Sequence, residues 1–354
     1  MTSPLLGTPA MFIRNQWYVA AWDSEVGRKP LARTLLDEPI VMYRKIDGEV
    51  VAMADACPHR LAPLSIGMVE GDNIRCKYHG VLFDGAGGCL EMPGQAQKLD
   101  YLKVKTYPVV ERYRFIWVWI GDAEKADPAL LPDLWPCESE GWSFEGGSYF
   151  IKANYKLMID NLMDLTHETH VHGASIGQDE LMSAPMQVRA EGEQVFLSRW
   201  MSDVDCPPFW QMLSGLKGKV DRWQVCQFIA PSTVMIDVGV APVGLLGGID
   251  GDRKLGAHGF VIDQMTPSSE DTCWYFWGLT RNFRADDPGF GQRARASQAK
   301  VFMEDVELLE AQQKTLDAFP GEKMRAFDID GGSMRARMVL DKLERAQQAA
   351  SDAA

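Results

Sequence analysis

The densest group of metal-binding side chains in this sequence lies in two short segments, Cys57-Pro58-His59 and Cys76-Lys77-Tyr78-His79. Each segment supplies one cysteine and one histidine, so a hairpin that joins them brings two thiols and two imidazoles into one small volume. Thiolates and imidazoles are ligands of zinc and of iron–sulfur clusters. The spacing therefore predicts a metal ion or a metal cluster bound by Cys57, His59, Cys76 and His79.

Two kinds of metal group fit this ligand set. A Rieske [2Fe–2S] centre takes two cysteines on one iron and two histidines on the other. A single zinc ion also accepts two cysteines and two histidines, but zinc fingers usually pair cysteine with cysteine and histidine with histidine. Because each segment here contains one residue of each type, the pattern favours the [2Fe–2S] cluster.

A second group of candidate ligands occupies residues 161–172, which contain three of the six histidines. His167-Glu168-Thr169-His170 does not match the zinc-protease pattern, in which the two histidines are four residues apart. On one regular helix His170 shares a face with His167, whereas His172 does so only if the helix ends or bulges near Gly173. This spacing leaves two pairs open, namely His167 with His170 and His167 with His172.

A carboxylate that completes such a site occurs late in the chain. Asp305 lies within an apolar stripe of helical spacing formed by Val301, Phe302, Leu308 and Leu309. A buried carboxylate requires a compensating charge. Two histidines and one carboxylate bind a ferrous ion and leave positions open for dioxygen. We therefore expect Asp305 to be the third iron ligand, and we expect the neighbouring Glu304, Glu307 and Glu310 to be solvated.

Composition limits the classes of partner. The formal net charge of −13 disfavours nucleic acid and anionic membrane surfaces. No apolar run is long enough to span a membrane. Seven cysteines without a recognisable signal segment indicate a reducing compartment, and we expect a cytoplasmic protein. No G-x-G-x-x-G motif is present, so the chain is not expected to bind NADH itself.

The distribution of apolar runs predicts two domains. Residues 11–121 contain short β-type runs separated by turns, as in the pair 39–43 and 50–53 around Asp47-Gly48, and indicate an antiparallel β domain. Residues 122–346 mix a helix over about 154–172 with strands and later helices, which is an α+β pattern. Residues 1–10 and 347–354 are expected to be loosely ordered, and Met1 and Met11 both remain candidate start sites.

Several of these segments together resemble a known family. The relevant stretches are 11–20, Cys57-Pro58-His59-Arg60, 76–80, 92–95, 154–157 and 160–167. In combination they are similar to the oxygenase components of Rieske non-haem iron aromatic oxygenases, in particular the group of vanillate O-demethylase and dicamba monooxygenase. This resemblance implies an N-terminal antiparallel β Rieske [2Fe–2S] domain and an α+β catalytic domain with a helix-grip-like antiparallel sheet.

The resemblance also implies roles for individual residues. It makes His167, His172 and Asp305 the ligands of a mononuclear Fe(II), and it places Asn161 beside that iron. It implies a homotrimer in which Asp164 connects His167 with His79 of the next subunit. Electrons from NADH would arrive through a separate reductase of the flavin or ferredoxin type.

The implied reaction uses dioxygen to remove the methyl group of a methoxylated aromatic acid as formaldehyde, leaving a phenol. Alternatives are oxygenation of an aryl methyl, an N-methyl or a ring carbon, and a Rieske electron-transfer protein without oxygen chemistry. Relatives carry a substrate-contacting histidine shortly before a Thr-Pro pair. Here Asp263 precedes Thr266-Pro267 and the nearest histidine is His258, so the substrate and the pocket roles of both residues stay open.

Overall fold

The computed structural model describes residues 12–95, 100–173 and 175–352, and its contacts divide the chain into two compact units. The N-terminal unit comprises residues up to 131 together with 266–270, and the C-terminal unit comprises 132–265 and the residues from 271 onward. The sequence placed the boundary at 121, ten residues earlier. The expected N-terminal tail, 1–10, lies outside the described residues. No helix in the described part of the chain is long and apolar enough to cross a membrane.

The N-terminal unit consists of three small sheets, with strand orders β1-β11-β10, β2-β3-β4-β9 and β5-β6-β7-β8. The predicted hairpin around Asp47-Gly48 is confirmed, because Arg44 pairs with Val50 and Gly48 has the positive φ of 95° that a tight turn favours. The strands are β1 Gln16–Trp22, β2 Leu31–Leu35, β3 Glu38–Arg44, β4 Val50–Ala54, β5 Met68–Glu70, β6 Asn73–Arg75, β7 Leu82–Phe83, β8 Cys89–Glu91, β9 Thr106–Tyr107, β10 Val109–Arg112 and β11 Phe115–Ile120.

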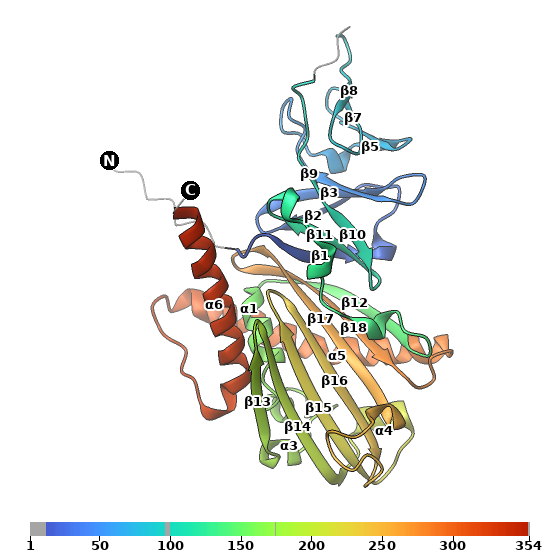
Figure 1. The fold of residues 1–354 in the computed structure, drawn as a ribbon, viewed down its shortest axis with the longest axis vertical. Helices are drawn as coiled ribbons and strands as arrows, with labels where there is room; N and C mark the ends of the chain where they lie inside the picture. The colour runs from blue at the N-terminus through green and yellow to red at the C-terminus, as the bar shows by residue number, and fades with distance from the viewer. Residues whose placement is uncertain (1–11, 96–99, 174, 353–354) are drawn as a thin grey trace. The chain divides into compact units, whose positions relative to one another are not determined.

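The C-terminal unit is built on a seven-stranded antiparallel sheet of order β12-β18-β17-β16-β15-β14-β13, and the long helix α5 crosses behind it in the view of Figure 1. The predicted α+β class is confirmed. Its strands are β12 Ser143–Ile151, β13 Met186–Glu191, β14 Gln194–Asp205, β15 Lys219–Ile229, β16 Thr233–Pro242, β17 Ala257–Ser269 and β18 Thr272–Arg281. Its helices are α1 Tyr155–Leu162, α2 Glu168–Val171, α3 Glu180–Ser183, α4 Pro208–Ser214, α5 Pro288–Ala318 and α6 Gly331–Asp352.

The single helix expected over 154–172 is wrong, since the chain forms α1, a turn and the short α2 instead. The physical reason lies at Asp164, whose Oδ1 accepts hydrogen bonds from the backbone N–H of Thr166 at 2.7 Å and from its hydroxyl at 2.6 Å. An aspartate side chain that captures the N–H two residues ahead competes with helical hydrogen bonding. The helix therefore ends before His167.

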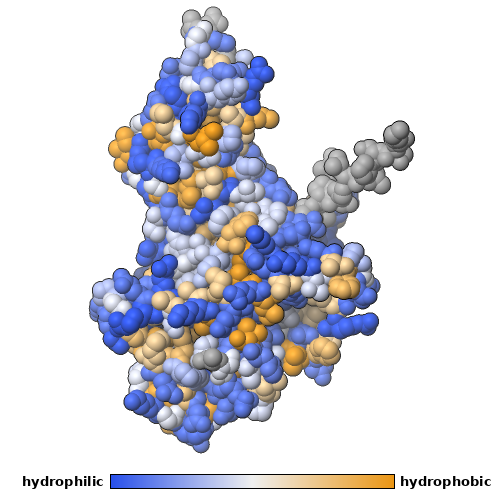
Figure 2. All heavy atoms as spheres, turned by 180° about the vertical axis from the view of Figure 1, so that it is seen from behind, coloured by the Kyte–Doolittle hydropathy of each residue, from blue (hydrophilic) through white to orange (hydrophobic). Residues whose placement is uncertain are grey.

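The C-terminal end of the chain also differs from the expectation. Residues 347–352, expected to be loosely ordered, continue helix α6 to Asp352, whereas 353–354 lie outside the described residues. The stretch has good helix formers, which explains why the helix continues. Figure 2 shows apolar side chains scattered among hydrophilic ones on the surface. After α5 the exposed apolar side chains include Met324, Phe327 and Met338.

Candidate metal centres and substrate cavity

The two N-terminal ligand segments fold into matching loops. The N–H of Cys57 donates to the carbonyl of Ala62, and the N–H of Cys76 donates to that of Val81, both at 2.8 Å. In each loop the residue four positions after the cysteine donates back to the cysteine carbonyl and has a positive φ, at Leu61 and at Gly80. The loops thus turn the following histidine of each segment toward a shared volume.

The two cysteines of these loops lie next to each other, and so do the two histidines. Both cysteines are buried, and the rings of His59 and His79 lie 4.5 Å apart between centroids. Nδ1 of His59 is buried without a hydrogen-bond partner among the described residues, which fits a nitrogen that binds a metal. Burial raises the pKa of the Cys57 thiol to about 11, so its thiolate needs a compensating metal charge. The residues present therefore fit a [2Fe–2S] cluster.

The second group of ligands gathers in the C-terminal unit. Donor atoms of His167, His172 and Asp305 all lie within 4.8 Å of one another. Oδ1 of Asp305 is 3.1 Å from Nε2 of His172 and 3.5 Å from Nε2 of His167. Two imidazoles and one carboxylate on one side of a small space fit a ferrous ion. His170 is exposed and does not belong to this group.

The elements around the group explain its geometry. His167 and His172 flank the short helix α2, and Asp305 comes from α5, which begins at the Asp287 cap and Pro288. Asp305 is only 2 % exposed, although Leu308 of the predicted stripe is exposed. Nδ1 of His167 lies 2.6 Å from the carbonyl of Asp164, which leaves Nε2 to face Asp305.

Two neighbouring polar side chains hold the ligands in place. The amide nitrogen of Asn161 donates to Oδ1 of Asp305 at 3.0 Å, so Asn161 lies beside this candidate ligand. Glu304 was expected to be solvated, which is wrong in part: its side chain is 42 % exposed, yet Oε2 lies 2.7 Å from Nδ1 of His172. Because a carboxylate only accepts, Nδ1 of His172 carries the proton and Nε2 is available to a metal. The position of Glu304 next to Asp305 in the sequence was the only signal that it could contact His172.

A central cavity opens beside the three ligands. It is lined by His167, His172 and Asp305 together with side chains from α1, α4, α5 and β15 to β18, most of them apolar, such as Phe209, Ile236, Val238 and Phe302. An apolar cavity with a few polar groups is typical of a small-molecule site. Its other polar residues include Glu168, Arg222 and Gln224, which the sequence did not single out.

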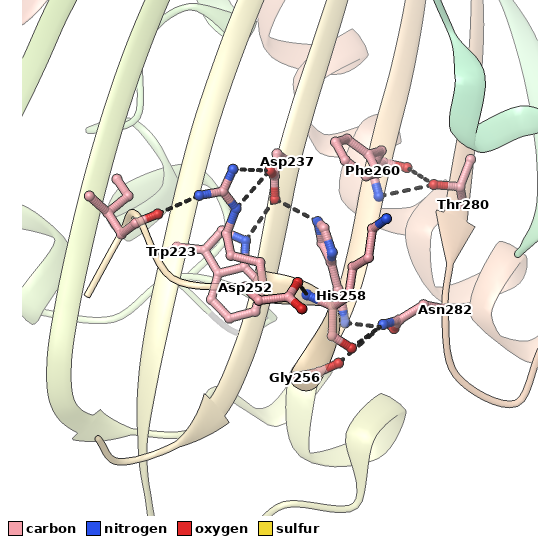
Figure 3. Close-up of polar contacts among 11 residues, drawn as sticks. Trp223, Asp237, Asp252, Gly256, His258, Phe260, Thr280 and Asn282 are labelled. Carbon is pink, nitrogen blue, oxygen red and sulfur yellow. Dashed lines mark hydrogen bonds and ion pairs between the residues drawn. The ribbon is translucent and has the colours of Figure 1, made fainter. Parts of the chain in front are cut away.

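His258 and Asp263 occupy different surroundings. Nε2 of His258 donates to Oδ1 of Asp237 at 2.8 Å, and Asp237 also accepts hydrogen bonds from Trp223 and Arg253 (Figure 3). Asp237 alternates along β16 with Ile236 and Val238, which line the cavity, so this network lies on the opposite face of the sheet. His258 is therefore no cavity residue.

Asp263 is fully buried, and it accepts a hydrogen bond of 2.6 Å from the hydroxyl of Tyr275. Burial raises the pKa of Asp263 to about 8, while the Tyr275 hydrogen bond opposes this shift. Tyr275 in turn packs edge-on against Phe302, a residue of the cavity wall. Asp263 therefore lies behind the cavity wall at Phe302 and is not among the residues that line the cavity.

Comparison with known proteins agrees with both centres. Residues 16–108 match the Rieske [2Fe–2S] domain, and residues 151–346 match the vanillate O-demethylase oxygenase C-terminal domain. The chain is 46% identical to a vanillate O-demethylase oxygenase subunit of Pseudomonas sp. strain HR199, over 97% of this chain and 98% of that protein. It is 38% identical to a toluene-4-sulfonate monooxygenase system iron-sulfur subunit of Comamonas testosteroni, over 95% and 98%.

A solved structure gives the same result. The crystal structure of dicamba monooxygenase bound to 3,6-dichlorosalicylic acid superposes with a TM-score of 0.90 and 34% identity, and the match covers 96% of this chain and 100% of that one. Another crystal structure of dicamba monooxygenase contains non-haem iron. The chain therefore belongs to the family of Rieske non-haem iron oxygenase components that includes the vanillate O-demethylase oxygenase subunits.

Proposed function

We propose that the protein is the oxygenase component of a monooxygenase that removes the methyl group of a methoxylated aromatic acid. The observation that carries this proposal is the group His167, His172 and Asp305 at one wall of an apolar cavity. The balanced reaction takes the methoxy arene, one dioxygen, two electrons and two protons. It yields the phenol, formaldehyde and water, because oxygen insertion into a methyl C–H bond gives a hemiacetal that collapses.

Each metal group contributes one kind of chemistry. When bound, the mononuclear iron activates dioxygen and the [2Fe–2S] cluster supplies electrons one at a time. The chain's own residues position and shield the reactants. Glu304 and Asn161 fix the orientation of His172 and Asp305, and the apolar walls exclude water from the methyl group.

We further propose that electrons pass between subunits of a homotrimer, from His79 of one chain through Asp164 to His167 of the next. Asp164 supports this role because, like His167, it lines both the central cavity and a second groove. Met324 and Met334 line this groove and are exposed, as expected of a surface that a second copy covers. The ring of His79 is exposed as well.

The remaining partners follow from the same proposal. NADH is oxidised by a separate reductase of the flavin or ferredoxin type, and the substrate is a small aromatic molecule that fits an apolar cavity. Among the described residues, Cys137, Cys206, Cys226 and Cys273, which lie outside the two cluster loops, form no disulfide, and this supports a cytoplasmic location.

The reaction is tested with the iron-loaded protein, a flavin–ferredoxin reductase, NADH and a panel of aromatic substrates. The expected result is one formaldehyde released per NADH consumed with 4-hydroxy-3-methoxybenzoate. Toluene-4-sulfonate is the comparison, because a relative carries that name. Oxidation of its methyl group in preference to demethylation, or formation of a ring diol without formaldehyde, contradicts the proposal.

A further inference from the structure

A buried polar group lies beside the iron ligands and is not used by the proposed reaction. Glu168 directly follows His167 and is 6 % exposed. Its Oε2 accepts a hydrogen bond from Nη2 of Arg222 at 3.1 Å, and its Oε1 accepts one from Nε2 of Gln224 at 2.5 Å. Arg222 and Gln224 are neighbours on the same face of β15 and line the central cavity together. We call these three residues the Arg222 cluster.

Two atoms of the Arg222 cluster lack partners. Nη1 of Arg222 donates to the carbonyl of Ile176 at 3.0 Å and to Oε1 of Gln178 at 2.5 Å, but its Nε–H has no partner within the described chain. Oε1 of Gln224 is likewise buried without a partner there. Arg222 and Gln224 are 2 % and 3 % exposed, so bulk water does not satisfy these atoms. Buried polar atoms without partners are rare and costly, which indicates that a ligand completes them.

The charges of the cluster restrict what this ligand group can be. Glu168 already neutralises Arg222 at 3.1 Å, and burial lowers the pKa of Arg222 while Glu168 opposes that shift. A substrate carboxylate would find one free N–H, and it would face both Oε1 of Gln224 and the Glu168 carboxylate. A hydroxyl has one donor and accepting lone pairs, so it matches one free donor and one free acceptor. The pattern selects a neutral hydroxyl over a carboxylate.

The position of the cluster restricts where this hydroxyl lies on the substrate. Glu168 is adjacent in sequence to the iron ligand His167, and all three cluster residues line the same cavity as His172 and Asp305. The group that they contact must therefore be close to the reacting methyl carbon. On a methoxylated ring the nearest such position is the one next to the methoxy group.

We propose that Arg222 and Gln224 form the subsite for a phenolic hydroxyl ortho to the methoxy group of the substrate, a step that rests on the proposed O-demethylation. Nε–H of Arg222 donates to the phenol oxygen, and the phenol proton is donated to Oε1 of Gln224. The preferred substrates are 2-methoxyphenols that carry their acid group elsewhere on the ring.

The test compares two ligands that differ only in this hydroxyl, 4-hydroxy-3-methoxybenzoate and 3-methoxybenzoate. Dissociation constants are measured by anaerobic calorimetry on the iron-loaded protein, and kcat/KM is measured by formaldehyde release. We expect the wild-type protein to prefer the hydroxylated ligand by about 10-fold or more in both, because a buried site built for a hydroxyl rejects the analogue without it.

In Gln224→Leu and in Arg222→Lys this preference falls to within about threefold, because the first lacks the acceptor and the second lacks the Nε–H. The loss comes from weaker binding of the hydroxylated ligand, whereas a general structural defect weakens both ligands equally. Gln227→Leu is the matched control, since Gln227 lies on the same strand but on the other face, where it donates to Gln194. It keeps the wild-type preference.

Three results separate the two proposals. If both variants keep the wild-type preference for 4-hydroxy-3-methoxybenzoate over 3-methoxybenzoate, the subsite is overturned. It is also overturned if the variants keep that preference but no longer discriminate between 4-hydroxy-3-methoxybenzoate and 2-methoxyphenol, which lacks the carboxylate. Tight, hydroxyl-dependent binding without formaldehyde release supports the subsite and contradicts the O-demethylation.

Discussion

At the scale of single residues, two histidines only two positions apart have opposite surroundings. His172 is 2 % exposed, and its two ring nitrogens face Glu304 and Asp305. His170, which lies within α2, is exposed. The difference arises because α2 is a short helix that ends at Val171, so His172 turns inward as the chain leaves it.

We expect His172→Ala to lose the mononuclear iron and His170→Ala to keep it. The first variant removes a nitrogen within reach of Asp305, and the second changes an exposed ring. Iron analysis and the absorption spectrum of the cluster measure both sites separately. Retention of the iron in His172→Ala with its loss in His170→Ala would show that the other histidine pair binds it.

At the scale of elements, α5 supplies both a ligand and the group that orients another ligand. Asp305 points into the unit, and the preceding residue, Glu304, reaches His172. Side chains one position apart on a helix diverge by about 100°, so the helix serves two neighbouring groups from one turn. In the N-terminal unit, Glu38 of β3 accepts hydrogen bonds from Arg14, which precedes β1, and from Lys105 and Tyr107 at β9.

Glu304→Gln is expected to weaken iron binding by about 10-fold or more, since loss of a carboxylate partner makes a histidine ligand less basic and less well oriented. The measurement is the iron dissociation constant under anaerobic conditions. Glu307→Gln provides the control, because Glu307 lies on the same helix and is exposed. Equal affinities in the two variants would refute the role of Glu304.

Glu38→Gln is expected to lower the free energy of unfolding by about 2 kcal/mol at pH 7. Burial of Glu38 alone would raise its pKa, but the hydrogen bonds from Lys105, Tyr107 and Arg14 outweigh it and lower the pKa to about 2. The carboxylate therefore stabilises the folded state above its ordinary pKa, and this stabilisation is lost as pH falls toward 2.

Urea unfolding between pH 7 and pH 3 measures this effect, and the difference between Glu38→Gln and wild type should shrink as pH falls below the ordinary carboxyl range. Glu111→Gln removes a more exposed pair with Arg44 and should change the stability by less than about 0.5 kcal/mol. A constant difference at all pH values would contradict the assignment of the effect to the Glu38 charge.

At the scale of the whole molecule, the Rieske [2Fe–2S] match lies in the N-terminal unit and the group His167, His172 and Asp305 lies in the C-terminal unit. An oxygenase of this composition holds about three irons per chain, two in the cluster and one mononuclear. Metal analysis of the anaerobically purified protein should give this value. About two irons, with the cluster spectrum intact, would favour an electron-transfer protein without oxygen chemistry.

The proposed path between subunits predicts complementation. Cys76→Ser removes a cluster ligand and His172→Ala removes an iron ligand, so each variant alone should be inactive. Random trimers formed by co-expression should recover roughly one quarter of wild-type activity. An intact cluster of one chain then faces an intact iron site of the next chain at one interface in four. Electron transfer within one chain would give no recovery.

The sequence by itself predicted the candidate ligands and determined the class of each domain. Cys57 with His59 and Cys76 with His79 are close in the chain, so local spacing was enough to predict their grouping, and the turn at Asp47-Gly48 was enough to predict a hairpin. Asp305 was identified because a carboxylate in an apolar helical stripe needs a partner.

Only the tertiary structure decided which side chains meet. It placed His172 and not His170 beside Asp305, because the Asp164 side chain ends the helix that the spacing had predicted. It also brought Glu304 to His172, and it brought Arg222 and Gln224 of β15 to Glu168. These pairs are 54 to 132 residues apart, and contacts over such separations depend on the packing of the sheet against α2 and α5 rather than on any local pattern.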